Sequence, residues 1–124
     1  MYVVQYNDIR GDNMDNQTVL DNMVNELKRG TQIMIVLDAL KNMQYGYSLL
    51  QVLNDRNVNI EAGTLYPLLR RLDKQGILES TWDTTESRPR KYYQLNEQGH
   101  DILKSLKQAW LELINDVNTS IMED

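Results

Sequence analysis

Two short stretches of this sequence hold most of the side chains that could do chemistry, and the chemistry they suit is the binding of anions. The two clusters consist of Arg70, Arg71 and Lys74, and of Arg88, Arg90 and Lys91. A guanidinium can pair bidentately with phosphate or with the edge of guanine, whereas an ammonium acts mainly as a point charge. Together the clusters predict a surface that binds a polyanion.

Catalytic and metal-binding functions find little support in the composition. The 124 residues include no cysteine and one histidine, which excludes disulfides, a thiolate nucleophile and a histidine-rich metal site. No glycine-rich phosphate loop and no nucleophile with a histidine base is present. No other metal-ligand type is arranged around His100 in the sequence, so we interpret it as a solvated or packed histidine. We expect no enzyme activity, no catalytic or metal-binding residues and no cofactor.

The net charge of −5 hides a basic centre. Residues 1–27 carry one arginine against five acidic residues, and residues 96–124 carry two lysines against six, so each segment sums to −4. Residues 28–95 carry ten cations against seven acids and sum to +3. This distribution is expected of a small module that contacts phosphate, although ordinary solvated faces are an alternative interpretation of charge alone.

The first cation cluster lies on a predicted helix from Thr64 to Gln75. Leu65, Leu68, Leu69 and Leu72 recur at i, i+3, i+4 and i+7, so one face is expected to be buried and the basic face to be free. With Thr64 as the N-cap, Pro67 falls in the first turn, where its missing N–H loses no bond. Gly76 supplies a left-handed stop.

The second cluster lies on a predicted hairpin. Residues 77–82 and 91–95 are rich in β-branched and aromatic side chains, and a polar loop from Asp83 to Arg90 joins them. Tyr92 and Tyr93 point to opposite faces of the second strand, so one of them belongs to the core. The hairpin therefore presents basic side chains near its tip.

Further helices flank these two elements. Residues 1–17 are interpreted as a polar extension, followed by a short amphipathic helix from Thr18 to Leu27, capped by Thr18. After a break at Gly30, a second helix runs from Thr31 to about residue 42, and a third from about residue 46 to 56. Asn96 caps a long final helix. Its apolar residues form a heptad seam that requires a partner helix, and the predicted dimer interface is Leu103, Leu106, Trp110, Leu113 and Val117.

This order of elements predicts a mainly α protein with a small β-hairpin, a winged helix-turn-helix plus a long C-terminal dimerisation helix. We expect an N-terminal extension at 1–27, the DNA-binding domain at 28–95 and the dimerisation helix at 96–124. The basic helix fits the major groove and the hairpin, or wing, reaches the adjacent backbone. No apolar run of membrane-spanning length and no secretory signal is found, so we expect a cytoplasmic protein without a membrane partner.

The chain resembles the PadR family of bacterial transcriptional regulators over roughly residues 27–99. Four segments in order carry the resemblance: LKRGTQIMIVLDAL, YGYSLLQVL, IEAGTLYPLLRRLDKQGILES and SRPRKYYQLNEQG. The terminal helix is similar to that of the short members of the family. The resemblance implies a homodimer that binds a pseudo-palindromic operator in double-stranded DNA, represses transcription and is released by a small-molecule effector.

The resemblance and the side-chain chemistry together give a set of expected DNA-binding residues: Tyr45, Tyr47, Thr64, Tyr66, Arg70, Arg71, Lys74, Arg88, Arg90 and Lys91.

Three of these residues have structural alternatives. Tyr66 packs under the wing or contacts DNA, Tyr47 is core or contact, and Arg71 pairs with an acid of the hairpin or with DNA. Trp110 is either dimer core or one wall of an aromatic effector pocket. An alternative function is a winged-helix protein-interaction module without operator binding.

Overall fold

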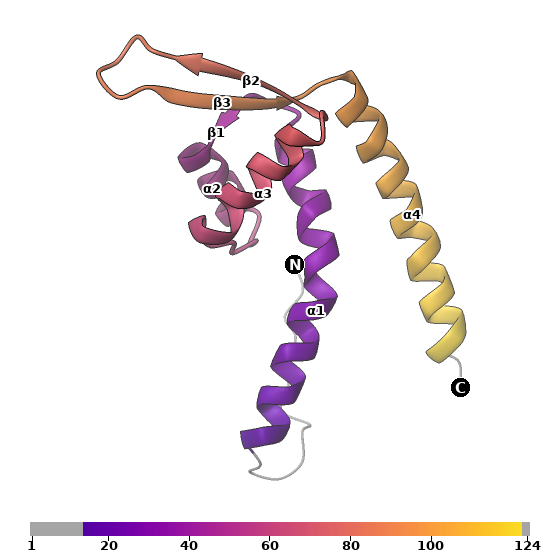
Figure 1. The fold of residues 1–124 in the computed structure, drawn as a ribbon. Helices are drawn as coiled ribbons and strands as arrows, with labels where there is room; N and C mark the ends of the chain where they lie inside the picture. Colours follow the sequence, from indigo (N-terminus) through magenta and orange to yellow (C-terminus); the bar gives the residue numbers. More distant parts are fainter. Residues whose placement is uncertain (1–13, 123–124) are drawn as a thin grey trace. The chain divides into compact units, whose positions relative to one another are not determined.

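The computed structural model describes residues 14–122, and Figure 1 shows the order of their helices and strands. The elements are α1 (Met14–Ala39), β1 (Gln44–Tyr45), α2 (Gly46–Asp55), α3 (Ala62–Lys74), β2 (Leu78–Asp83), β3 (Arg90–Leu95) and α4 (Glu97–Ile121). Most of the predicted N-terminal extension, residues 1–13, lies outside the described residues. The chain divides into two units, residues 1–33 and 34–124, with the boundary inside α1. The mainly helical winged helix-turn-helix class with a long C-terminal helix is confirmed.

A single helix, α1, replaces the two that the sequence predicted on either side of Gly30. Thr31, the expected N-cap of the second helix, lies inside α1, and its hydroxyl donates to the carbonyl of Lys28 at 2.8 Å. Thr18 is likewise inside the helix, so the predicted capping box is wrong. A glycine inside a helix costs only about 1 kcal/mol relative to alanine, which is too little to end a helix with good formers on both sides.

The core of the second unit forms where α1 ends and where α2 and α3 pack. Val36 and Leu37 of α1 and Leu40, just after it, are buried, as are Leu49 and Leu53 of α2. All four leucines of the α3 stripe are buried too, which confirms the predicted apolar face. Burying a leucine contributes about 1.5–3 kcal/mol, so this stripe fixes the rotation of α3 about its axis.

The sheet has three antiparallel strands in the order β1-β3-β2. The two long strands start and end within one residue of their predicted bounds. The short strand β1 lies in the break that the sequence predicts between two helices; Gln44 pairs with Tyr93, and Tyr45 with Tyr92. Tyr93 is the core tyrosine of the predicted pair, and the Tyr92 ring instead meets Tyr45 edge-on at 5.3 Å.

Helix α4 starts at the predicted cap. The Asn96 carboxamide oxygen accepts from the N–H of Gly99 at 2.8 Å, and its amide group donates to the Gly76 carbonyl at 2.8 Å. Gly76 has a φ of 81°, the left-handed stop that was predicted for α3. A Cβ on Gly99 would collide with the carbonyl of Ile77, so only glycine permits this close approach.

Leu103 is buried within its own chain at 3% exposure. It therefore packs in the core of a single chain, which corrects its assignment to the dimer seam.

A single carboxylate, Asp38 of α1, connects that helix to α4 and to the C-cap residue of α2. It accepts hydrogen bonds from Arg56, just after α2, at 2.8 Å and from Lys107 of α4 at 3.2 Å, and it pairs with Lys41 at 2.9 Å. Partial burial alone would raise the pKa of Asp38, but the hydrogen bonds from Lys41, Arg56 and Lys107 outweigh it and lower the pKa from 3.8 to about 2. The charged form is therefore favoured in the folded state, and the cluster fastens α4 to the end of α1.

We expect Asp38→Asn to lower the free energy of unfolding by about 1–2 kcal/mol at neutral pH, the lower value reflecting screening at a partly exposed site. The folded pKa lies below the unfolded one, so this stabilisation is present above about pH 4 and is lost as the pH falls toward 2. Urea unfolding at several pH values should show the difference between wild type and variant shrinking over that interval. Glu79→Gln, which removes an exposed carboxylate with no ion pair among residues 14–122, is the control. A difference independent of pH would contradict the account.

Candidate nucleic-acid interface

Helix α3 begins earlier than predicted, with Glu61 rather than Thr64 as its N-cap. The N–H groups of Thr64 and Leu65 both donate to the Glu61 carbonyl at 2.9 Å. Pro67 therefore lies inside the helix, five residues after Ala62, and the prediction that it marks the first turn is wrong. Its missing hydrogen bond would have gone to the carbonyl of Gly63, an exposed residue whose carbonyl water can reach.

The basic face of α3 is exposed along its second half. Arg70, Arg71 and Lys74 are all exposed, and none of them forms an ion pair with any residue that the structure describes. The alternative in which Arg71 pairs with an acid of the hairpin is thus not observed. Arg71 and Lys74 lie in the last turn of α3, where the helix dipole favours cations and so helps to hold these charges without carboxylate partners.

Tyrosines line the N-terminal side of this face. The Tyr66 ring packs so closely on Gly46 that a Cβ there would collide with it, yet Tyr66 stays 39% exposed. Tyr47 is more exposed still, and its hydroxyl accepts a hydrogen bond from Gln51 at 3.0 Å. Tyr47 is therefore a surface residue, not the core residue of the alternative interpretation. Both hydroxyls can reach a ligand that lies along α3.

The wing is the hairpin of β2, β3 and the loop at residues 84–89. Its tip is shaped by Asp83, whose carboxylate accepts from the N–H and the hydroxyl of Thr85 at 3.0 and 2.7 Å; these hydrogen bonds lower the pKa of Asp83. Arg88 is exposed and has no ion pair within the described chain. Arg90 stacks over the Tyr45 ring at 4.7 Å and lies 3.6 Å from Glu86. One arginine of the wing is free, and the other is held in place.

Lys91 differs from the other predicted contacts because it is already bound within the chain. Its ammonium donates to Asp73 of α3 at 3.2 Å and lies 5.3 Å from the Tyr93 ring and 5.9 Å from the Trp82 ring. It thereby ties the wing to α3. Trp82 itself was missed by the sequence analysis, although its position opposite the cation cluster of the hairpin offered a signal.

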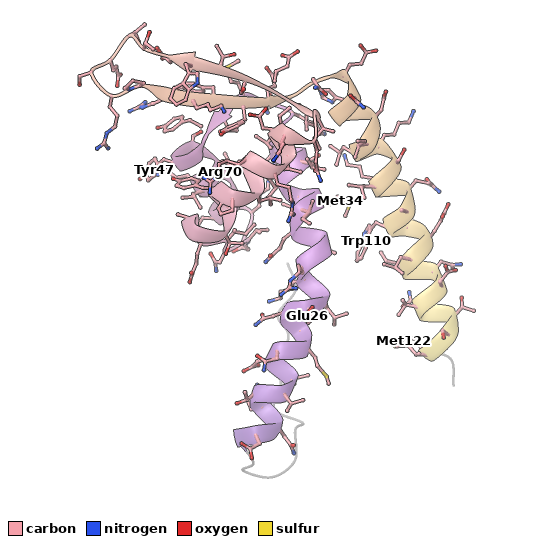
Figure 2. All side chains as sticks on the ribbon, viewed as in Figure 1. Glu26, Met34, Tyr47, Arg70, Trp110 and Met122 are labelled. Carbon is pink, nitrogen blue, oxygen red and sulfur yellow. The ribbon has the colours of Figure 1, made fainter. Side chains whose placement is uncertain are left out.

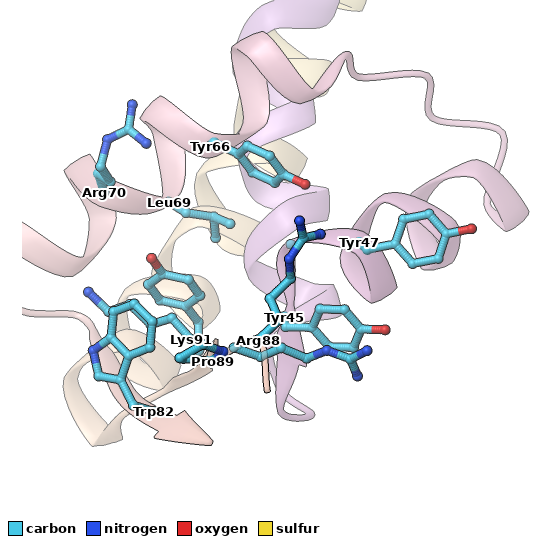
Figure 3. Close-up of a pocket in the computed structure, with 12 residues that line it drawn as sticks. Tyr45, Tyr47, Tyr66, Leu69, Arg70, Trp82, Arg88, Pro89 and Lys91 are labelled. Atoms are coloured by element: carbon cyan, nitrogen blue, oxygen red, sulfur yellow. The ribbon is translucent and has the colours of Figure 1, made fainter. Parts of the chain in front are cut away.

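A groove of about 780 Å³ runs between α3 and the wing, and Figure 3 shows the side chains on either side of it. Tyr66, Leu69 and Arg70 line it from α3, and Trp82 and Lys91 from the wing. The groove brings together most of the predicted DNA-binding residues, namely Tyr45, Tyr47, Tyr66, Arg70, Arg88, Arg90 and Lys91. Thr64, Arg71 and Lys74 lie on α3 outside it. A groove walled by cations and aromatic rings suits a polyanion that also offers flat apolar surface.

The seam of α4 is mostly uncovered. Leu106 is half-buried, and Trp110, Leu113 and Val117 are exposed, at 55% for Leu113. Trp110 points from α4 toward Met34 (Figure 2). It lines a mainly apolar cavity of about 320 Å³, together with Met34, Ile35, Asp38, Arg56, Val58 and Lys107. Among residues 14–122 no group of histidines and acids could hold a metal ion, and no helix is long and apolar enough to cross a membrane.

Comparison with known proteins agrees with this geometry. The sequence pattern of the transcriptional regulator PadR-like family matches residues 36–105. A PadR family transcriptional regulator from Eggerthella lenta is 41% identical; the similarity covers 90% of this chain and 100% of that one, with a TM-score of 0.86. A PadR-like regulator from Bacillus cereus is 27% identical, over 80% of this chain and 99% of that one, with a TM-score of 0.67.

A curated relative gives the same result. The transcriptional regulator Rv3488 of Mycobacterium tuberculosis is 30% identical over 90 residues, which are 73% of this chain and 84% of the relative. The family match spans more than half of the chain and includes α2, α3, the wing and the start of α4. The chain therefore belongs to the PadR-like family of transcriptional regulators.

Proposed function

We propose that this protein is a dimeric repressor that binds a pseudo-palindromic operator with α3 in the major groove and the wing along the adjacent backbone. One observation carries the proposal: two arginines that line the helix–wing groove have no acidic partner among the described residues, whereas the other two cations of the groove, Arg90 and Lys91, pair with Glu86 and Asp73. Lys41, Arg56 and Lys107 all pair with Asp38. Arg70 and Arg88 do not pair, and unpaired cations that face one groove favour a phosphate ligand.

The side chains divide into two roles by type. Arg70, on the wall of the groove, and Arg71, one residue further, can pair with phosphate or, because arginine can address guanine bidentately, with a base edge. Lys74 and Arg88 suit phosphates. The hydroxyls of Tyr47, Thr64 and Tyr66, and of Tyr45 at the rim, suit backbone oxygens, which fix the register of a protein on DNA without reading sequence.

The α4 seam supports the dimer. Leu106, Trp110, Leu113 and Val117 follow one heptad stripe, and a single chain leaves most of that stripe in water. A second copy of α4 would cover it by knobs-into-holes packing. Two copies related by a twofold axis present two α3 helices, which matches an operator with two inverted half-sites.

The cavity beside Trp110 supports release by a small aromatic effector. Its walls are mainly apolar, and the charged residues among them, Asp38, Arg56 and Lys107, already pair with one another, so a planar aromatic compound fits its chemistry. Such a ligand regulates only if it favours one spacing of the two α3 helices over another. The cavity is lined by residues of α4 and of the end of α1, so a ligand bound in it can alter how the dimerisation helix packs on α1.

Replacing Arg70 or Arg88 by alanine should weaken binding to a generic DNA duplex by about tenfold and flatten its salt dependence by roughly one counterion per lost phosphate contact. Fluorescence anisotropy of a labelled duplex at several salt concentrations measures both effects. Lys104→Ala removes an exposed cation of α4 outside the groove and is the matched control. Weak, salt-insensitive binding by the intact protein would favour the alternative, a winged-helix protein-interaction module.

Placing a charge on the seam should separate the dimer. We expect Leu113→Lys to yield a monomer by analytical ultracentrifugation and to weaken binding to a palindromic duplex, because the two half-sites are then bound independently. Asn115→Lys introduces the same charge on the opposite side of α4 and should leave a dimer. If the seam variant stays dimeric, the interface lies elsewhere.

Effector binding can be followed at Trp110 alone in a Trp82→Phe variant, since the chain has only two tryptophans. Titration with planar cationic dyes and with phenolic compounds should reveal a ligand that quenches Trp110 fluorescence and weakens DNA binding over the same concentration range. Quenching without any change in DNA binding would defeat the regulatory proposal.

A further inference from the structure

Trp82 is a large aromatic side chain left in solvent on the wing. It lies at the end of β2 and is 60% exposed, although the same strand buries Leu78. An exposed indole leaves a large apolar area in water, and tryptophans of this kind concentrate at binding surfaces because the ring is apolar and its N–H can donate a hydrogen bond. The local fold therefore gives no packing reason for a tryptophan here.

The strand alternation places Trp82 on the α3 side of the sheet. Residues two apart share a face, so Trp82 lies with Leu78, and the register pairs it with Lys91 across the hairpin. Lys91 in turn reaches Asp73 of α3. Trp82 therefore lines the helix–wing groove, together with Arg70 and Arg88 (Figure 3).

Lys91 holds this ring and is poorly suited to bind phosphate. Its ammonium is 3.2 Å from the Asp73 carboxylate and lies near the Tyr93 and Trp82 rings, and only 31% of its side chain is exposed. A cation with a carboxylate partner has little charge left for a further anion, and its attraction to the indole face keeps the ring at the groove. The side chains that can neutralise phosphate beside Trp82 are the unpaired arginines.

We propose that Trp82 contacts DNA directly, its ring packing on a deoxyribose or a base edge of the strand that passes the wing, and that Lys91 is a positioning residue for this ring. This inference rests on the proposed DNA-binding function and adds a residue that has no charge to it. The occupant is DNA because the cations flanking the ring, Arg70 and Arg88, complement phosphates, and a nucleotide offers flat faces beside each phosphate.

The first test uses Trp82 as its own reporter. Trp110→Phe leaves Trp82 as the only indole, and we expect a generic DNA duplex at low salt to quench its fluorescence and to protect it from acrylamide. In the free protein Lys91→Ala should shift the Trp82 emission, whereas Lys91→Arg should preserve it, an effect that a purely structural lysine would not produce.

The second test measures affinity and salt dependence together. Trp82→Ala should weaken binding at least about fivefold while leaving the salt slope unchanged, because no ion pair with phosphate is lost. Trp82→Phe should stay within about threefold of wild type, since it keeps an aromatic face. Thr81→Ala, exposed on the other face of the same strand, should bind as wild type does, and thermal unfolding verifies that each variant is folded.

The outcomes separate this inference from the function on which it rests. Salt-dependent DNA binding with unperturbed Trp82 fluorescence and wild-type affinity for Trp82→Ala would overturn the tryptophan contact and leave the DNA-binding function standing. A Trp82→Ala variant with a reduced salt slope would also overturn it, because the loss would then reflect displaced cations. Absence of DNA binding by the unmodified protein at low salt would overturn both.

Discussion

Burial of the leucine stripe of α3 determines which side chains this protein offers to a partner. Leu65, Leu68, Leu69 and Leu72 are buried against the core, so the helix cannot rotate without exposing several of them to water. The opposite face must then carry Arg70 and its neighbours. Around this helix, Tyr45, Tyr47 and the side chains of the wing complete the walls of the groove.

Two sets of polar contacts extend that constraint to the rest of the second unit. The Lys91–Asp73 pair connects the wing to α3, and the Asp38 cluster connects α4 to the end of α1 and to the residue that follows α2. In both sets a carboxylate holds cations that would otherwise be available to an anion. Arg70 and Arg88 line the helix–wing groove without such a partner among the described residues, so they are the groove cations best suited to bind DNA.

Much of this fold could be predicted from the sequence because its patterns are local. The α3 stripe, the glycine stop at Gly76, the two long strands and the Asn96 cap each depend on residues a few positions apart. The errors involve weaker or more distant effects. Gly30 does not break α1, since its cost is small beside the length of the helix, and the two-residue β1 exists only through pairing with β3.

In the candidate site, too, local patterns could be predicted from the sequence, whereas contacts between distant residues could not. Residue types identified the basic helix and the basic wing, but not which cations are already paired. Lys91 meets Asp73 eighteen residues earlier in the chain, a contact that no spacing rule predicts. A heptad pattern also cannot separate a leucine that packs within its own chain, as Leu103 does, from one that awaits a partner helix. Trp82 was overlooked because an aromatic residue in a strand is ordinarily part of a core.

The most direct test of a symmetric, sequence-reading dimer is selection of bound duplexes from random DNA with the purified protein, followed by sequencing. The account predicts enrichment of two inverted half-sites whose centres are separated by about one helical turn, or a multiple of it, since two α3 helices must enter the major groove on one side of the duplex. Recovery of unenriched sequences, or of a single half-site without a symmetric partner, would contradict it.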